Sequence, residues 1–259
     1  AHASSSGNII AIEPRPVARR QGGEAPCIVI ECDGEDAAIP VAAPGDIRAM
    51  TPADLLSRIL DGGIVGLGGA VFPTAQKLMQ ARSANVELLI LNGVECEPYI
   101  SCDDMLMRTR AAAVVSGAQI LLQALQVETC LIAVESDKPV ALERLGAALA
   151  AAGDERIVLR QVPTIYPSGG EDQLVQLVTN REVPSGGLPT DVGCLVQNVQ
   201  TLFNIARAAK GAAVTHRLLT VAGAVARPVT LWVPVGTAIG DVLAWAGGVQ
   251  PPRWSERTA

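Results

Sequence analysis

Three apolar segments that alternate with two helical segments constrain the fold of this chain more than any other feature. Residues 86–91, 128–134 and 156–162 carry Val, Leu and Ile as buried strands do, whereas residues 103–125 and 139–152 have the length and the Ala and Leu content of helices. An order of strand, helix, strand, helix and strand predicts a parallel sheet with right-handed crossovers. We therefore expect an α/β fold with a parallel-sheet, Rossmann-like core.

The loops after these strands are the first places to look for a binding site. In open parallel sheets, ligands bind in the crevice outside the carboxyl ends of the strands. Residues 92–101 follow the first predicted strand and residues 163–170 follow the third. We expect both loops to contribute to one ligand site.

Shorter helices are expected around this alternation. One begins at Thr51, which can cap a helix, and ends before Gly62. Two more are expected at residues 171–178 and 198–209. We place the core at residues 51–213.

The first 50 residues are expected to form a separate, β-like segment. Residues 9–12 and 27–31 read as two short strands, with prolines and glycines between them. A few strands in isolation do not make a stable sheet. This segment, residues 1–50, must therefore pack against something else.

The last part of the chain, residues 214–259, changes character in the same way. Strands are expected at 218–222 and 229–233, and a helix at 239–246 that ends at Gly247. These elements predict a second small β-rich module.

Charge and hydropathy exclude several classes of function. The net charge of −6 over 259 residues argues against nucleic-acid binding, which needs a basic surface. No apolar stretch approaches the roughly 18–20 residues of a membrane span, so no direct span is expected. With two histidines in the chain, a histidine-based zinc site and a Ser-His-Asp triad are not expected.

The cysteines do not form the pattern of a metal site. None belongs to a C-x-x-C pair, so reduced, free thiols and no bound metal are expected. The six lie at positions 27, 32, 96, 102, 130 and 194.

The glycine-dense segment Gly66–Thr74, with Lys77 beyond it, is the first candidate binding motif. Glycines let backbone N–H groups approach a phosphate or a flat ring, and a lysine can bind a phosphate as a point charge. No Gly-Lys-Ser/Thr follows, as a P-loop requires, and a helix precedes the segment where a Rossmann fingerprint has a strand. An ordinary flexible loop is the alternative interpretation.

A second motif, Asn92–Tyr99, directly follows the first predicted strand. Its carboxylates, Glu95 and Glu97, are two residues apart and can accept hydrogen bonds from ribose hydroxyls or a flavin ring N–H. The alternative is a solvated turn.

Two further motifs lie before predicted helices. Tyr166–Asp172 places Glu171 near a helix start, where a carboxylate can also complement the helix dipole. Val196–Leu202 contains Asn198, which can be no more than a helix cap.

Together, and in this order, the four motifs resemble those of RnfC, the C subunits of Rnf electron-transport complexes, and more distantly the NADH-binding subunit of respiratory complex I. The resemblance implies sites for two ligands. Residues that would line FMN are Gly66, Gly68, Gly69, Lys77, Asn92, Glu95 and Asn198. Residues that would face NADH are Phe72, Glu97 and Glu171.

The chain departs from the complex I pattern at several of these positions. The differing residues are Leu67, Val71, Val94, Gly170 and Gln197. Val71 stands where that pattern has glycine, and a stiff β-branched residue is expected to impose a different backbone there. This favours a second reading, a non-catalytic scaffold that has lost its flavin. A soluble NAD-dependent dehydrogenase with a Rossmann site is the third.

The resemblance also implies what surrounds this chain. Residues 1–50 would be part of a barrel-sandwich module, and residues 214–259 a β-grasp module. The intact subunit would be part of an NADH:ferredoxin-type oxidoreductase and translocase, with [4Fe–4S] clusters only outside this chain. Its partners would be the other Rnf subunits and a ferredoxin-type carrier. It would lie peripherally on the cytoplasmic face of the bacterial inner membrane.

Overall fold

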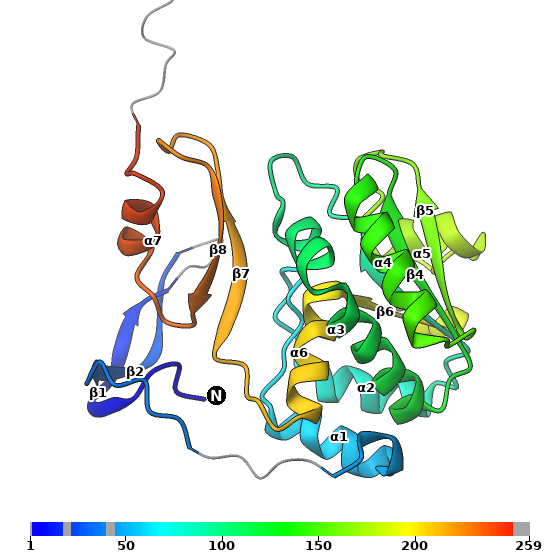
Figure 1. The fold of residues 1–259 in the computed structure, drawn as a ribbon, viewed down its shortest axis with the longest axis horizontal. Helices are drawn as coiled ribbons and strands as arrows, with labels where there is room; N and C mark the ends of the chain where they lie inside the picture. Colours follow the sequence, from blue (N-terminus) through cyan, green and yellow to red (C-terminus); the bar gives the residue numbers. More distant parts are fainter. Residues whose placement is uncertain (1, 18–21, 40–44, 251–259) are drawn as a thin grey trace, which may run out of the picture.

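The computed structural model describes residues 2–17, 22–39 and 45–250 (Figure 1). An α/β core with one four-stranded sheet is accompanied by two separate two-stranded sheets. Residues 40–44 of the expected N-terminal module and residues 251–259 of the expected C-terminal module lie outside the described ranges.

The core sheet is parallel, as the alternation of strands and helices predicts. Its strands are β3 (Leu88–Gly93), β4 (Thr129–Glu135), β5 (Ile157–Val162) and β6 (Cys194–Asn198). They lie in the order β5-β4-β3-β6, and each neighbouring pair is parallel. The prediction of a parallel-sheet α/β core is confirmed.

Helices cover both faces of this sheet. They are α1 (Pro52–Asp61), α2 (Thr74–Ser83), α3 (Cys102–Leu125), α4 (Pro139–Ala152), α5 (Glu171–Thr179) and α6 (Val199–Ala209). Leu89 and Leu91 of β3 pack into the large hydrophobic core with α1, α3 and α6, whereas Ile90 between them packs into a smaller core with α5. Burial on both faces explains why the central strands β3 and β4 are mostly apolar, whereas the edge strand β5 is partly exposed and carries polar residues.

Strand β6 is absent from the sequence-based expectation, which gives no element to residues 194–197. The strand has only five residues, and its partner β3 lies about a hundred residues earlier in the chain. Asn198 is the last residue of β6 and at the same time the N-cap of α6, so no loop separates the two elements. A short strand with a distant partner leaves little periodic signal in the sequence.

The N-terminal segment is an antiparallel hairpin of β1 (Gly7–Pro16) and β2 (Glu24–Cys32). Both strands are longer than predicted, because Pro14 and Pro26 lie opposite each other within the ladder and do not end it. A ribbon of two strands has two free edges, and proline is tolerated where its missing N–H faces such an edge.

The C-terminal elements are β7 (His216–Val221), β8 (Val229–Pro234) and α7 (Ile239–Trp245). They share a small hydrophobic core of their own, formed by Val221, Val233, Val242 and Ala246. Two 3-10 helices, Ile47–Ala49 and Pro189–Val192, lie in the connecting segments.

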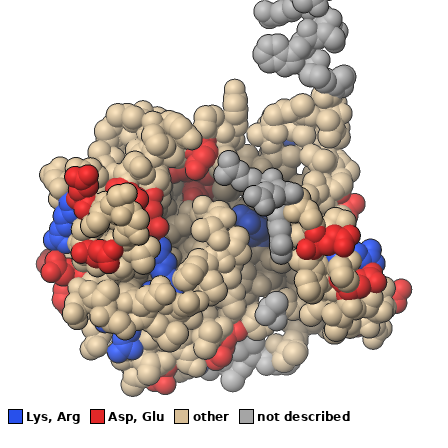
Figure 2. Space-filling view, turned by 180° about the vertical axis from the view of Figure 1, so that it is seen from behind, with Lys and Arg blue, Asp and Glu red and all other residues tan. Residues whose placement is uncertain are grey.

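The surface carries charges of both signs in small groups. On the face shown in Figure 2, acidic and basic side chains alternate over the described residues without a continuous basic patch. The acidic groups on this face agree with the net charge of −6.

Candidate functional site

The order of the core strands defines where a ligand can bind. The chain runs outward from β3 to β4 and β5, and then returns to place β6 on the other side of β3. The carboxyl ends of β3 and β6 therefore form the topological switch point of the sheet, the place at which open α/β sheets bind ligands. Asn92 at the end of β3 is the register partner of Asn198 at the end of β6.

The glycine-dense segment, residues 66–74, forms a loop that packs against this switch point and is called the glycine loop below. It begins after α1 and ends at α2, and the N–H of Gly66 donates to the carbonyl of Phe72 at 2.8 Å. The N–H of Leu67 donates to Thr201 Oγ1 of α6 at 3.1 Å. A Cβ added to Gly68 would lie 3.3 Å from Cβ of Asn198, so the loop packs against the end of β6.

Val71 keeps a backbone that glycine adopts freely, with φ of 55°. The expectation that a β-branched residue imposes a different conformation from glycine at this position stays a prediction. Such a left-handed φ costs a residue like valine about 1–3 kcal/mol. The side chain is 57% exposed, so no packing contact prevents the loop from holding it there.

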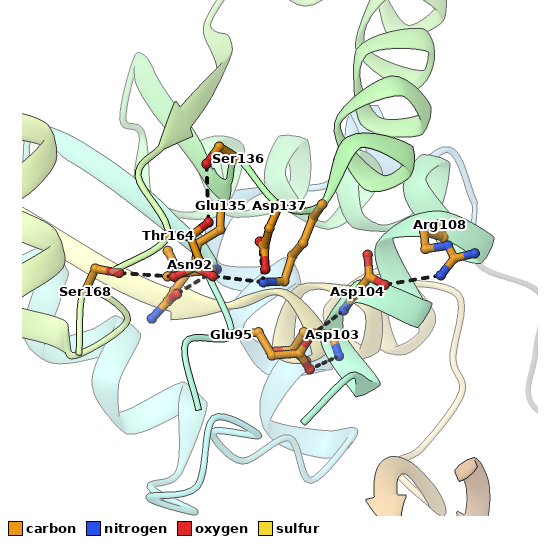
Figure 3. A network of polar contacts seen from close by, with 12 residues as sticks. Asn92, Glu95, Asp103, Asp104, Arg108, Glu135, Ser136, Asp137, Thr164 and Ser168 are labelled. Carbon is orange, nitrogen blue, oxygen red and sulfur yellow. Dashed lines mark hydrogen bonds and ion pairs between the residues drawn. The ribbon is translucent and has the colours of Figure 1, made fainter. Parts of the chain in front are cut away.

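Glu95 of the second motif caps helix α3. Its two carboxylate oxygens accept the backbone N–H of Asp103 at 2.6 Å and of Asp104 at 2.9 Å (Figure 3). Burial, and then the neighbouring charge of Asp103, raise the pKa of Glu95 to about 7. The carboxyl group is therefore held in place and titrates near neutral pH.

Asp103 connects this cap to Asn198. The buried Asp103 carboxylate accepts from Asn198 Nδ2 at 2.6 Å and from Gln200 Nε2 at 2.9 Å. The side chain of Asn198 also accepts from the N–H of Gln200 at 2.9 Å, as an N-cap does. Asn198 therefore caps α6, as the alternative interpretation of the sequence predicted. It also belongs to the hydrogen-bond network at the switch point.

The third motif joins the network through Asn92. Asn92 Nδ2 donates to the carbonyl of Gly169 at 2.8 Å. A Cβ on Gly169 would lie 2.9 Å from Cys96 Sγ, so glycine permits the close approach of the two loops. The loops that follow β3 and β5 therefore meet, as the carboxyl-end rule predicts.

Lys77 and Glu171 form an ion pair across the site. Lys77 Nζ lies 2.6 Å from Glu171 Oε1 and donates to the carbonyl of Val196 at 2.8 Å. The resemblance assigned Lys77 to FMN and Glu171 to NADH, but the structure brings the two side chains together. Both positions remain adjacent to the glycine loop and to β6.

Phe72 and Glu97 are exposed members of the predicted site. Phe72 is 40% exposed and Glu97 is exposed as well. Neither side chain has a hydrogen-bond or ion-pair partner among the described residues. Both are therefore free to contact a ligand that approaches from solvent.

A buried ion pair at the end of β4 escaped the sequence-based prediction. Glu135 is 2% exposed, accepts from Ser168 Oγ at 3.2 Å and pairs with Lys138 Nζ at 3.1 Å (Figure 3). The sequence contained one signal for this pair, because an acid at the end of a predicted strand is followed three residues later by a lysine. The pair fixes the third motif, since Ser168 belongs to it.

Two cysteines belong to separate networks at this edge. Cys96 Sγ accepts from the N–H of Gly169, and Cys102 Sγ accepts from Gln200 Nε2, each at 3.3 Å. Burial raises the pKa of both thiols, that of Cys102 to about 12. Both are therefore protonated at neutral pH, and the described residues gather no group of four thiols such as an iron–sulfur cluster requires.

The residues at the switch point fit a ligand that carries a phosphate and acceptor oxygens, as FMN does. Two buried polar atoms here, Thr74 Oγ1 and Gln197 Nε2, lack a partner among the described residues. Buried polar atoms normally have partners. With the open glycine loop and the cation of Lys77, they provide donors and a charge for such a group.

The described cavities lie outside this edge or border it. A cavity of about 670 Å³ extends between the loop after β5 and α5, and Pro167 and Ser168 of the third motif are part of its lining. Another of about 830 Å³ lies by the C-terminal half of α3, with Gln123 and Arg156 in its wall. The glycine loop lines neither of them.

We expect Glu95→Gln to change how stability depends on pH. The pKa of Glu95 rises from 4.5 to about 7 on folding, so between these values the folded chain holds a proton that the unfolded chain has lost. The contribution of this carboxyl to the free energy of unfolding therefore falls as pH rises through that window. Between pH 5 and pH 8 the variant should gain about 2 kcal/mol relative to the unmodified chain, after a discount for partial exposure.

Urea denaturation at pH 5, 6, 7 and 8 measures this effect. Glu97→Gln, two residues away and exposed, is the matched control and should track the unmodified chain. Parallel pH profiles for the chain and its Glu95→Gln variant would show that the carboxyl does not titrate in this window.

Comparisons with known proteins agree on one family. Residues 59–207 match the Nuo51 FMN-binding domain, and residues 218–257 match the SLBB domain. The chain is 46% identical to the C subunit of the ion-translocating oxidoreductase complex of Pseudomonas aeruginosa and 43% identical to the protein of the same name from Haemophilus influenzae, over 95% of this chain. It spans 32% and 37% of these relatives, about a third of their length. A crystal structure of an NAD⁺-reducing [NiFe]-hydrogenase in the air-oxidized state is similar to it, with a TM-score of 0.67 and 26% identity over 80% of this chain and 40% of that one.

Proposed function

The chain belongs to the Nuo51 FMN-binding domain family, and on that premise we propose that it is the FMN- and NADH-binding part of an electron-transport subunit. One observation carries the proposal. Asn92 and Asn198, from motifs far apart in the sequence, are register partners at the switch point of the sheet, beneath the glycine loop. Open parallel sheets bind nucleotide cofactors at this place.

We assign FMN to the edge formed by the glycine loop, β3 and β6. Gly66, Gly68 and Gly69 leave the face of the loop free of side chains, so that a flat ring can lie against the backbone. Lys77 neutralises the phosphate as a point charge. The remaining assigned residues, Asn92, Glu95 and Asn198, provide amide and carboxylate groups for the ring and ribityl hydroxyls.

We assign NADH to the open side of the same site. Phe72 offers an exposed aromatic face for stacking, and Glu97 and Glu171 offer acceptors for ribose hydroxyls. FMN, when bound, supplies the chemistry of accepting a hydride and releasing single electrons. The residues of the chain hold the two ligands in register, and the buried network beneath them keeps the site rigid.

The intact subunit, in our proposal, passes electrons between NAD(H) and a ferredoxin-type carrier. The [4Fe–4S] clusters that this needs belong to a part of the protein outside this chain. The name of the relatives, an ion-translocating oxidoreductase complex, supports coupling to ion movement and partnership with other subunits of an Rnf complex. We place the subunit peripherally, on the cytoplasmic face of the inner membrane.

Among the described helices, none combines the length and the apolar character needed to cross a lipid bilayer.

We also propose the division of the chain into residues 1–50, 51–213 and 214–259. The β1–β2 hairpin, the α/β core and the elements from β7 to α7 support it, since the last of these share a separate hydrophobic core. The SLBB match over residues 218–257 agrees with the third unit, a β-grasp module.

Two other functions were open from the sequence. A Rossmann-type NAD-dependent dehydrogenase needs a strand before the glycine loop, whereas helix α1 precedes it here. A scaffold without flavin was suggested by Val71, which lies at a left-handed φ of 55° in the loop. FMN binding is the property that separates the proposal from the scaffold.

Titration of FMN with the chain tests the proposal directly. We expect saturable quenching of flavin fluorescence, with a dissociation constant in the micromolar range or below. The loaded chain should then reduce its flavin when NADH is added under anaerobic conditions. Absence of saturable quenching at high micromolar concentrations would favour the scaffold.

A further inference from the structure

The β7–β8 hairpin contacts α3, the helix whose first-turn backbone N–H groups donate to Glu95. The N–H of Ser101, the residue before α3, donates to Thr220 Oγ1 of β7 at 3.0 Å. The hydroxyl of Ser101 lies 3.0 Å from Thr230 Oγ1 of β8. Thr220 and Thr230 are direct partners in the β7–β8 ladder, so adjacent strands present their hydroxyls to one residue of the core.

Ser101 is a sensitive point of the site. It occupies the N-cap position of α3 without a capping hydrogen bond from its side chain, and the Glu95 carboxylate accepts instead from the backbone N–H groups of Asp103 and Asp104 in the first turn. A shift of Ser101 therefore moves the donors that fix Glu95. It also moves Asp103, which binds Asn198.

The same hairpin also packs against helix α6. Trp232 of β8 meets Phe203 of α6 edge to face, with ring centroids 5.7 Å apart and planes at 85°. The guanidinium of Arg207 lies 5.4 Å from the Trp232 ring and 5.7 Å from the Phe203 ring. His216 of β7 also stacks on Trp232, with ring centroids 5.7 Å apart. Contacts of this kind stabilise the docking of the hairpin beyond the area that they bury.

One hairpin thus holds both helices whose N-termini build the switch-point network. Helix α3 begins beside Asp103, and α6 begins at Asn198. Strand β7 also adds charge, because Arg217 is among the groups that oppose the rise that burial causes in the pKa of Asp103. In Figure 1, β7 and β8 stand between α7 and the core.

We propose that Thr220 and Thr230 are positioning residues of the flavin site, so that the C-terminal β module sets the FMN affinity of the core. This inference rests on the proposed function, because it takes the switch-point edge as the place of the flavin. The two threonines act through Ser101 and α3, without touching the ligand themselves.

The double variant Thr220→Val/Thr230→Val tests the proposal, because valine keeps the shape and removes both hydroxyls. We expect the FMN dissociation constant to rise about five- to tenfold, as two hydrogen bonds of modest net strength are lost. Hydrogen exchange at the amides of Asp103 and Asp104 should accelerate in the flavin-free chain. The Thr220→Ser/Thr230→Ser variant keeps the hydroxyls and should restore both values.

Thr237→Val is the matched control, since its hydroxyl donates to Pro234 within the same module. It should leave FMN binding and exchange unchanged. If the double variant does not fold, Thr230→Val alone, which removes only the contact to the Ser101 hydroxyl, decides the question with the same two measurements.

The outcomes separate the two proposals. Unchanged FMN affinity and unchanged exchange in the valine variants would overturn the positioning role. If the unmodified chain binds no FMN, the proposed function fails, whereas the exchange of the two α3 amides still decides whether the hairpin positions the helix.

Discussion

Gly117→Ala will lower the free energy of unfolding by about 3 kcal/mol or more, because it overpacks the contact between two helices. Gly117 lies in the middle of α3, where this helix crosses α6. A Cβ at this position would lie 2.2 Å from the carbonyl oxygen of Leu202 and 2.7 Å from its carbonyl carbon. Both are backbone atoms, so no side-chain rotation can relieve the clash, and the two helices must move apart.

Gly146→Ala is the matched control, since Gly146 lies within α4 and a Cβ there meets no atom within 4 Å. Alanine at this site should raise the free energy of unfolding by about 0.5–1 kcal/mol, because it reduces the freedom of the unfolded chain and favours the helix. Urea denaturation measures both variants. Equal effects of the two substitutions would mean that the close approach of α3 and α6 does not exist in solution.

The consequence of this clash extends to the candidate site. Separation of α3 from α6 would lengthen the hydrogen bonds of Asp103 to Asn198 and Gln200, which join the two helices at their N-termini. Gly117 lies about four turns from the N-terminus of α3, and the non-helical residue Arg110 lies between them, so the shift would reach the site through an interrupted helix.

The sequence predicts the elements of this fold well where the hydrophobic periodicity agrees with the residues that begin and end helices. The range expected for the helix over residues 139–152 is the one found, and Thr51 caps α1 with the reciprocal bond from Asp54. The parallel sheet follows from the alternation of elements. These features depend on neighbours within one segment, which is why a single sequence contains them.

Features that depend on distant residues could not be obtained in this way. Strand β6 exists because β3 offers an open edge, and the five residues from Cys194 have no periodicity of their own. Strands β1 and β2 continue past Pro14 and Pro26 because a two-stranded ribbon has free edges. Each of these outcomes is set by pairing across the chain, which local propensity does not contain.

The candidate site likewise combines residues that the sequence predicts with residues that it does not. The motifs placed Asn92, Glu95 and Asn198 near strand ends and helix starts, and the structure brings them to one edge. Asp103, which holds Asn198, was not predicted because an acid at a helix start is adequately explained by the helix dipole alone. Gln200 lies within the fourth motif, but the sequence assigned no role to it. The Lys77–Glu171 pair was missed because 94 residues separate its members.

Lys77→Ala will weaken FMN binding by about ten- to a hundredfold and leave riboflavin binding within about twofold. A charge-assisted bond to a phosphate is worth about 1.5–3 kcal/mol, and riboflavin lacks the phosphate. In the chain without ligand Lys77 pairs with Glu171, but the two side chains are 29% and 42% exposed. An exposed pair of this kind contributes only about 0–1 kcal/mol, so a phosphate dianion can replace it.

Fluorescence titrations with both flavins measure this difference. Lys210→Ala, at the C-terminal end of α6, is the matched control and should bind both flavins as the unmodified chain does. Glu171→Gln completes the set, because it removes the partner of Lys77 and keeps the cation. It should leave FMN affinity within about threefold and raise the NADH concentration needed for flavin reduction about tenfold, the effect of losing one charged hydrogen bond. Equal losses of FMN and riboflavin in Lys77→Ala would place the phosphate elsewhere, and loss of FMN in Glu171→Gln would assign this carboxylate to the flavin.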